Sequence, residues 1–501
     1  MKRAVFAMAV CAAIAAAGAA KPQAVVIFYA DDLGYFDTST YGSQHIPTPN
    51  LDALAAEGVK FLDAHSATSV CTPSRYSLLT GNYAFRRKNN HILDGDAKLI
   101  LPLEGGGVLT LPAMMREAGY RTAAIGKWHL GLGAGSEPTD WNSRVSPGPR
   151  EVGFESSYIM AATADRVPCV FLRDGNVVGL DPADPIEISY SRSPDPIWEG
   201  EITAKTNPEL LKWWGRSADK QHDKTIIDGI SRIGHQRGGK AANWKGEDIA
   251  DVLAEEAENF IASSEGKPIF LYFCTADIHV PRDPHPRYKG KSQLGLRGDV
   301  AVQMDDTLGK VRDSLARHGY LDTLFIFTSD NGPVVGDGYL DGARMAYAAA
   351  NVNPAHPFTG GKYTIYEGGT RVPMVVAWPG HTPKGATSSA LVSQTDFARS
   401  IASIIGYEVP EGSMGDSQDL SQTLLGARAT GRDTLVEEAG WGSWRGFRMG
   451  SWKLMTDGEN AKLFDLAQDV TETEDVASSR SDLADFMKAS LRDTVQEHKR
   501  H

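Results

Sequence analysis

Cysteine is scarce in this chain, which has 4 cysteines among 501 residues. So few thiols exclude a disulfide-based scaffold. Cys11 lies in the first twenty residues, and Cys71, Cys169 and Cys274 lie beyond them. In an oxidising compartment these three form an odd number, so at least one thiol stays free or has a special role.

Long apolar runs and an excess of basic charge are also missing. No stretch beyond residue 20 reaches about 18 consecutive apolar residues, so we expect no membrane span. Lys and Arg number 51 against 63 Asp and Glu, a net charge of −12. This balance argues against a nucleic-acid partner, which usually requires a basic surface. An anionic small substrate remains compatible, because a local basic pocket can lie in an acidic protein.

The first twenty residues have the pattern of a secretory signal peptide. Lys2-Arg3 precedes an apolar run over residues 5–17 and small residues at 18–20, as in exported proteins. A lipid anchor on Cys11 is disfavoured, because Val10 before it is not a small residue. We therefore expect an exported protein, periplasmic or secreted.

Short apolar runs alternate with helical patterns along most of the chain. Strands are predicted at residues 24–29, 121–125, 268–274, 323–328 and 372–378, and helices at 50–56, 109–118, 247–264, 300–317 and 395–405. This alternation predicts an α/β fold with a large, mostly parallel sheet between layers of helices.

Two segments depart from that pattern. Residues 140–242 are rich in Pro, Asp and Gly, and are predicted to be a loop-rich insert over one face. Residues 427–501 contain four short strand patterns and a closing helix at 482–498, which predict a smaller antiparallel α+β subdomain. The expected division is a signal peptide at 1–20, a catalytic domain at 21–426 and a C-terminal subdomain at 427–501.

Oxygen-bearing side chains follow two of the predicted strands. Asp31 and Asp32 come after the first strand, and Asp330 and Asn331 follow the strand at 323–328. An Asp pair alone often only caps a turn, but two such clusters at strand ends suit a hard cation such as Ca²⁺ or Mg²⁺.

A possible nucleophile and several cations accompany these clusters. Residues 71–75 read CTPSR, and a helical turn is predicted to open at Ser74. A thiol beside a helix start and Arg75 is expected to have a lowered pKa, although a buried, inert Cys71 is the alternative. The other cationic candidates are Lys127, His129, His279 and Lys362. Positive charge beside a carboxylate-held metal suits a tetrahedral oxyanion such as sulfate or phosphate.

The ordered motifs identify a family resemblance. The chain resembles the type I, formylglycine-dependent sulfatases of the alkaline phosphatase superfamily. Residues 71–75 match the C-x-P-x-R signature, and 111–131, ending in GKWHLG, match the second signature. TSDNG at 328–332 and the segment 361–373 match later blocks. The resemblance runs from Val25 to about Leu466.

The resemblance implies a modified nucleophile and a metal. Cys71 would be oxidised to formylglycine by a maturation enzyme, and the hydrate of this aldehyde would attack sulfate. Ca²⁺, rather than Mg²⁺, would be held by the side chains of Asp31, Asp32, Cys71, Asp330 and Asn331.

It also implies roles for the cations. Lys127, Lys362 and His279 would bind the sulfate, and one of them would protonate the leaving alcohol. His129 would assist breakdown of the sulfated intermediate, and Arg75 would steady the formylglycine.

The substrate is less defined than the chemistry. The segment containing Asp165 and Arg166 resembles bacterial carbohydrate sulfatases acting on 6-sulfated galactose or N-acetylgalactosamine. These two residues could bind sugar hydroxyls or simply form a loop salt bridge. Trp213, Trp214 and His222 are further candidates, although adjacent tryptophans often only pack. The alternatives are an arylsulfatase, a phosphodiesterase or phosphonate hydrolase, and an inactive protein that binds sulfated glycans.

Overall fold

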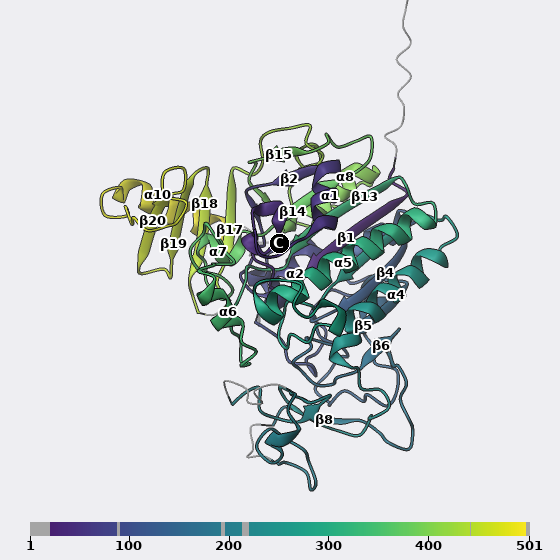
Figure 1. The fold of residues 1–501 in the computed structure, drawn as a ribbon. Coiled ribbons are helices and arrows are strands. Elements are labelled where there is room, and N and C mark those ends of the chain that lie inside the picture. Colours follow the sequence, from purple (N-terminus) through teal and green to yellow (C-terminus); the bar gives the residue numbers. More distant parts are fainter. Residues whose placement is uncertain (1–20, 88–90, 192–195, 213–219, 441, 497–501) are drawn as a thin grey trace, which may run out of the picture.

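The computed structural model describes residues 21–87, 91–191, 196–212, 220–440 and 442–496 (Figure 1). The predicted signal peptide at 1–20 and the tryptophans at 213 and 214 lie outside these ranges. Within the described ranges, no helix combines the length and apolar character needed to cross a bilayer.

A ten-stranded sheet forms the centre of the molecule (Figure 1). Its middle consists of five parallel strands in the order β13 (Thr323–Ser329), β1 (Ala24–Ala30), β12 (Ile269–Cys274), β4 (Arg121–Lys127) and β5 (Ser156–Met160). Every residue of β1, β12 and β13 is buried. Continuous burial requires cover on both faces, as the apolar runs in the sequence predicted.

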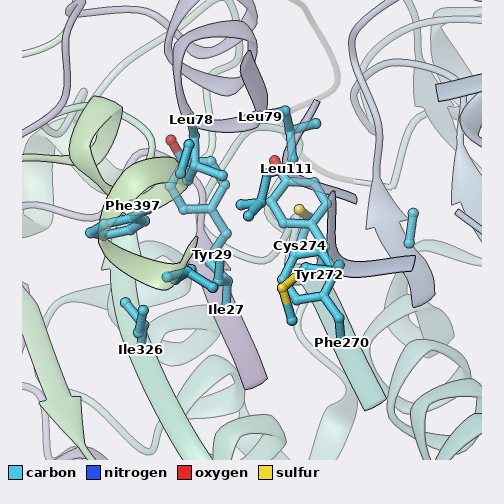
Figure 2. Close-up of a cluster of buried hydrophobic side chains, with 14 of the residues drawn as sticks. Ile27, Tyr29, Leu78, Leu79, Leu111, Phe270, Tyr272, Cys274, Ile326 and Phe397 are labelled. Carbon is cyan, nitrogen blue, oxygen red and sulfur yellow. The ribbon is translucent and has the colours of Figure 1, made fainter. Parts of the chain in front are cut away.

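Alternate residues of β1 separate the two covering layers. Ile27 and Tyr29 pack with α2 (Cys71–Thr80), α3 (Leu111–Glu117) and α8 (Phe397–Ile405), as Figure 2 shows for Leu78, Leu111 and Phe397. Val26 and Phe28 face α1 (Pro49–Glu57), α4 (Ile249–Ala262) and α5 (Gly295–Arg317). The predicted arrangement of a sheet between helices is confirmed, because side chains alternate between the faces of a strand.

Antiparallel strands extend the sheet on both sides. β14 (Met374–Ala377) pairs antiparallel with β13, and β2 (Val59–Phe61) and β15 (Ala386–Ser388) follow it. On the other side, β6 (Phe171–Arg173) and β7 (Asn176–Val177) continue from β5.

The predicted loop-rich character of residues 140–242 is therefore only partly right. β5, β6 and β7 belong to the main sheet, because short strands at a sheet edge need little sequence periodicity once a neighbour offers hydrogen bonds. The rest carries the small pairs β8 (Glu187–Ser189) with β11 (His235–Arg237) and β9 (Ile226–Ile227) with β10 (Ile230–Ser231).

Other short elements complete the main layer. β3 (Ala64–His65) pairs with β16 (Val392–Ser393), and the short helices are α6 (Ala343–Ala349), α7 (Glu367–Thr370) and α9 (Ser421–Leu424). α7 lies between the segment that carries Lys362 and the start of β14.

The C-terminal region contains the predicted second sheet. β17 (Thr434–Glu438), β18 (Arg445–Met449), β19 (Trp452–Thr456) and β20 (Ala461–Asp465) form an antiparallel meander. α10 (Ser481–Gln496) packs Met487 and Leu491 against Leu454 and Leu463. Figure 1 shows this sheet beside α7, at the left of the view.

A network of buried charges joins this sheet to the main layer. The Lys453 ammonium on β19 lies 2.8 Å from Glu367 on α7, 3.2 Å from Glu437 and 3.3 Å from Glu472. Arg448 also contacts Glu367, at 3.2 Å. Buried charges need partners, so this buried ionic cluster holds the two parts together.

Candidate active site

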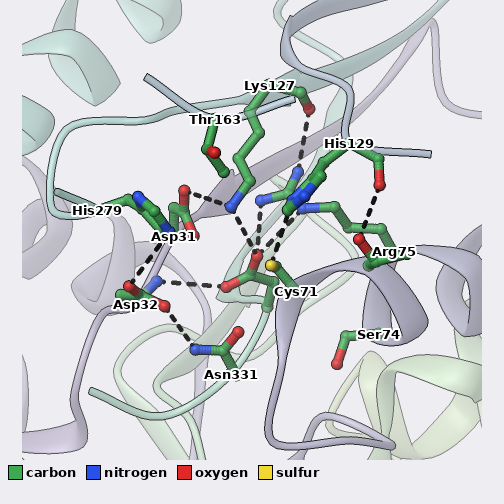
Figure 3. A network of polar contacts seen from close by, with 12 residues as sticks. Asp31, Asp32, Cys71, Ser74, Arg75, Lys127, His129, Thr163, His279 and Asn331 are labelled. Carbon is green, nitrogen blue, oxygen red and sulfur yellow. Dashed lines mark hydrogen bonds and ion pairs between the residues drawn. The ribbon is translucent and has the colours of Figure 1, made fainter. Parts of the chain in front are cut away.

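The predicted site residues converge at one edge of the main sheet (Figure 3). Asp31 and Asp32 follow β1, Asp330 and Asn331 follow β13, and Lys127 ends β4. Carboxyl ends of parallel strands meet at the same edge, where α/β sheets bind ligands. Lys362 joins them from the opposite chain direction, because it precedes β14, which is antiparallel to β13.

The acidic residues form a compact set of oxygen ligands. The Asn331 amide donates to Asp32 Oδ1 at 2.7 Å, and the backbone N–H of Asp32 donates to Asp330 Oδ1 at 3.3 Å. Asp31, Asp32 and His279 each offer one metal-ligating atom, and these three atoms lie within 4.8 Å of one another. Asp330 also lies in this set, but Arg75 engages its carboxylate with bonds of 2.8 and 3.1 Å.

Two buried oxygens of this set indicate that a cation fits. In the described part of the chain, Asp31 Oδ1 and Asn331 Oδ1 are buried and have no hydrogen-bond partner. An unsatisfied buried acceptor is costly, and a hard cation would satisfy both oxygens. The donor set is therefore suited to Ca²⁺ or Mg²⁺, as the sequence predicted.

Two lysines lie against Asp31 and Asp32. Lys127 Nζ lies 2.6 Å from Asp31 Oδ2, and Lys362 Nζ lies 2.9 Å from Asp32 Oδ2. Burial raises the pKa of Asp31 to about 8, although Lys127 opposes the shift. Burial acts on Asp32 in the same way, but Lys362 and Lys127 outweigh it and hold the pKa of Asp32 below its ordinary value.

Cys71 lies at the first residue of α2, three residues earlier than the predicted helix start at Ser74. Its Sγ is 3.2 Å from His129 Nδ1, and His129 Nε2 is 2.8 Å from the Leu93 carbonyl oxygen. Because a carbonyl only accepts, Nε2 carries the proton and Nδ1 accepts from the thiol. The side chain of residue 71 thus faces a base that can take its proton.

The expected lowering of the Cys71 pKa is wrong for the unmodified thiol. Cys71 is buried, and burial raises its pKa, although Lys127 and Lys362 oppose the shift. Arg75 does not assist, since its guanidinium bonds Asp330 and the Lys127 carbonyl, the latter at 3.1 Å. Arg75 is close to Cys71 in the sequence, but its guanidinium pairs with the Asp330 carboxylate instead of the Cys71 thiol.

The pKa values of the two histidines are lowered. Burial, together with Lys127, keeps the pKa of His129 well below its ordinary value, and burial with Lys362 does the same for His279. His279 Nδ1 donates to the Val280 carbonyl at 2.7 Å, so its Nε2 is an acceptor 4.0 Å from Asp32 Oδ2. Asp32 and His129 hold positive φ angles of 56° and 55°, unusual values that are frequent at functional sites.

The residues predicted to bind sugar lie beside this cluster. Arg166 Nη1 lies 3.0 Å from Asp165 Oδ1, and His222 Nε2 lies 3.3 Å from Asp165 Oδ2. The loop salt bridge considered from the sequence therefore exists. The pair still borders the cation cluster, because Arg166 contributes to lowering the pKa of His129 and His279 to lowering that of Asp165.

Sequence patterns missed two further residues of the site. Asp337, on the loop after β13, has its carboxylate 3.2 Å from Lys362 Nζ and 3.0 Å from the Tyr363 hydroxyl. Tyr363 has a positive φ of 75°. The position of Tyr363 directly after Lys362 could have identified it from the sequence. Asp337 lies in a Gly-rich loop that carries no motif.

The cysteines the structure describes, Cys71, Cys169 and Cys274, are all free and buried. Cys274 lies in the core, as predicted. Cys169 and Cys274 therefore do not pair in this structure, and the odd cysteine count needs no disulfide partner.

Comparison with known proteins agrees with this chemistry. The family model described as Sulfatase matches residues 23–407, and the model for the C-terminal region of N-sulphoglucosamine sulphohydrolase matches residues 361–500. The fold and the strand-end site define a hydrolase of oxyanion esters. The chain belongs to the sulfatase family, and it is a sulfuric ester hydrolase.

Individual relatives cover most of the chain. An N-acetylgalactosamine-6-O-sulfatase of Bacteroides thetaiotaomicron is 41% identical over 481 residues, covering 92% of this chain and 91% of the relative. Arylsulfatase A of Bos taurus is 30% identical, covering 83% of this chain and 70% of its own length. A solved structure from work on glycosaminoglycan metabolism by B. thetaiotaomicron has a TM-score of 0.89 at 39% identity, covering 96% of this chain and 100% of the other.

Proposed function

We propose that this sulfatase removes O-sulfate from a sulfated saccharide, and specifically 6-O-sulfate from galactose or N-acetylgalactosamine-type units. The observation that supports the proposal is the buried Asp165–Arg166 pair, whose charges act on His129 and His279 and which would bind sugar hydroxyls beside the sulfate. The name of the relative that is 41% identical supports the same sugar and position.

Desulfation of defined saccharides tests the substrate directly. Galactose and N-acetylgalactosamine carrying sulfate at single positions, with matching phosphate esters, separate sugar, position and ester type. Release of sulfate from the 6-sulfated sugars is expected. Equal rates at other positions, or faster phosphate release, would contradict the proposal.

The proposed nucleophile is formylglycine made from Cys71 by a maturation enzyme. When present, the aldehyde hydrate supplies an oxygen nucleophile whose sulfated form can collapse to the carbonyl, whereas a sulfated thiol would be a dead end. The position of residue 71 supports this role, since its side chain faces His129 Nδ1 at the start of α2. Formation of formylglycine and the signal-peptide pattern both suit export to the periplasm or beyond.

The surrounding residues bind the ester and move protons. Lys127 and Lys362 hold the sulfate oxygens with their ammonium groups, and His279 Nε2 faces the same space. His129 Nδ1 accepts a proton from the side chain of residue 71. The leaving alcohol takes its proton from one of these three sulfate-binding groups.

Arg75 acts on the reaction indirectly, through the residues that it binds. Its two hydrogen bonds to Asp330 Oδ2 and its bond to the Lys127 carbonyl fix two ligating elements relative to α2. We therefore assign Arg75 to positioning rather than to direct contact with the formylglycine.

Metal content provides a separate prediction. Asp31, Asp32, Asp330 and Asn331 would hold Ca²⁺, which supplies positive charge for the nucleophile and a sulfate oxygen. Elemental analysis of active protein should find calcium and no stoichiometric zinc, because the four ligands are all oxygens. Asp31→Ala should lower kcat/KM by at least about a hundredfold and abolish tight calcium binding.

The exposed Asp433 offers a matched control, since Asp433→Ala removes an acidic side chain away from the site. That variant should keep both calcium and activity. Stoichiometric zinc in wild-type protein, or calcium retained by Asp31→Ala at wild-type affinity, would refute the ligand assignment.

The sugar contacts can be tested by a contrast between two substrates. Asp165→Ala or Arg166→Ala should lower kcat/KM on a 6-sulfated galactose-type sugar by tenfold to over a hundredfold, which corresponds to about 1.5–3 kcal/mol for one charged hydrogen bond. A simple aryl sulfate has no sugar hydroxyls, so its turnover should change little. The comparison is made by steady-state kinetics on both substrates with each variant.

Equal losses on the two substrates would show that the pair supports the catalytic core instead. Unchanged rates on both would move sugar recognition to another segment, with His222 as the next described candidate. His222 contacts Asp165 and stacks edge-on against Tyr339 at 4.8 Å.

A further inference from the structure

One carboxylate near the reacting centre has no place in the metal set. Asp337 is the most exposed member of the cluster, with 20% of its side chain accessible, and it bonds Lys362 and Tyr363. Its charge also acts on His279. Asp337 therefore borders Lys362, one of the proposed sulfate-binding lysines.

Four other carboxylates of the site each lie against a cation. Asp31 pairs with Lys127 at 2.6 Å, Asp32 with Lys362 at 2.9 Å and Asp330 with Arg75 at 2.8 Å. On the sugar side, Asp165 pairs with Arg166 at 3.0 Å. Asp337 is a second carboxylate on Lys362, whose ammonium Asp32 already engages.

Asp337 thus adds a negative charge beside Lys362. Burial would raise the pKa of Asp337, but Lys362 outweighs it and the pKa lies below its ordinary value, so the group is a carboxylate at neutral pH. A sulfate monoester carries one negative charge, whereas a phosphate monoester carries close to two above its second pKa of about 6. An added negative charge at Lys362 therefore disfavours the phosphate ester more than the sulfate ester.

We propose that Asp337 is a specificity-determining residue, whose carboxylate beside Lys362 favours the singly charged sulfate ester over the doubly charged phosphate ester. This inference rests on the proposed sulfate-binding site. The Coulomb energy scales with the product of the charges, so a repelling carboxylate costs the phosphate ester twice as much as the sulfate ester. Asp337 contributes the same single negative charge whether or not a cation is bound at the site.

Binding of two esters that differ only in the anion is the direct test. The probes are 4-nitrophenyl sulfate and 4-nitrophenyl phosphate at pH 8, measured by calorimetry on calcium-loaded Cys71→Ala protein with and without Asp337→Asn. Asp337→Asn should tighten binding of the phosphate ester by about tenfold more than binding of the sulfate ester. The ratio of kcat/KM for the two esters should shift in the same direction in the Cys71 enzyme.

Tyr363→Phe is the matched control. It removes the hydroxyl that bonds Asp337 but keeps the carboxylate, so the ratio of the two dissociation constants should stay within about twofold. Raising the salt concentration should shrink the effect of Asp337→Asn, as expected for a charge effect.

Three outcomes would overturn the inference. The first is an unchanged ratio of the two dissociation constants in Asp337→Asn. The second is equally weaker binding of both esters, which would indicate that Asp337 only positions Lys362. The third is a loss of activity confined to sulfated sugars, which would indicate that Asp337 contacts the sugar. Failure of the proposed function looks different: wild-type protein would release no sulfate from any sugar, while the ratio of ester affinities would still report on Asp337.

Discussion

Replacing Cys71 with alanine is expected to lower kcat/KM by more than about 10⁴-fold on both aryl sulfate and sulfated sugar, because loss of a nucleophile removes the covalent path. Residue 71 is the nucleophile candidate beside His129 Nδ1, at 3.2 Å. The fold should survive, since only one sulfur atom is removed and the expected cost in stability is about 1 kcal/mol. Steady-state kinetics and thermal unfolding measure the two effects.

Cys274→Ala provides the comparison for this variant. Cys274 is also buried and free, but it packs in the core with Tyr272 and Phe270. The Cys274→Ala protein should unfold at a lower temperature than the wild type and keep its activity. Peptide mass spectrometry completes the test: highly active protein in which residue 71 is only an unmodified thiol would refute the formylglycine mechanism, as would near-full activity of Cys71→Ala.

Replacing Lys453 with methionine should have the largest effect on stability, a loss of about 3–5 kcal/mol in the free energy of unfolding. Lys453 is fully buried and is the cation shared by Glu367, Glu437 and Glu472. Its removal leaves three buried carboxylates with one fewer partner, and an uncompensated buried charge is far more costly than a lost surface pair. Urea unfolding followed by tryptophan fluorescence gives the loss.

Lys462→Met tests whether any lysine of that sheet has this effect. Lys462 lies on β20, is partly exposed and donates to the Tyr366 hydroxyl at 3.2 Å, so its loss should cost less than about 1 kcal/mol. If the free energy of unfolding falls equally little in Lys453→Met and Lys462→Met, the buried network does not stabilise the fold.

The stability loss of Lys453→Met should also depend on pH in a predictable direction. Burial raises the pKa of Glu472 to about 7 in the wild type, although Lys453 opposes the shift. A raised carboxyl pKa contributes stability below the unfolded value, near 4.5, and that contribution is lost as pH rises through about 7. Without Lys453 the deficit should therefore be smaller at pH 5, where Glu472 is protonated, than at pH 8.

The strand ends show how much the sequence could determine. The apolar runs at β1, β4, β12 and β13 predicted buried parallel strands, and parallel strands must end at the same edge. Asp31, Asp330 and Lys127 were therefore predictable neighbours before any coordinate was known. The ordered motifs added Cys71, His129 and Lys362, and the structure brings all of them to that edge.

The sequence by itself determined the strand ends, the residue types that line them and the class of chemistry, because local periodicity and motif spacing encode these. Only the tertiary structure decided which charges pair. It gave Arg75 to Asp330 rather than to Cys71, kept the Cys71 thiol protonated by burial, and brought Asp337 to Lys362 from another loop. The physical reason is that ion pairing and desolvation depend on distances of a few ångströms between segments far apart in the chain, which no local pattern specifies.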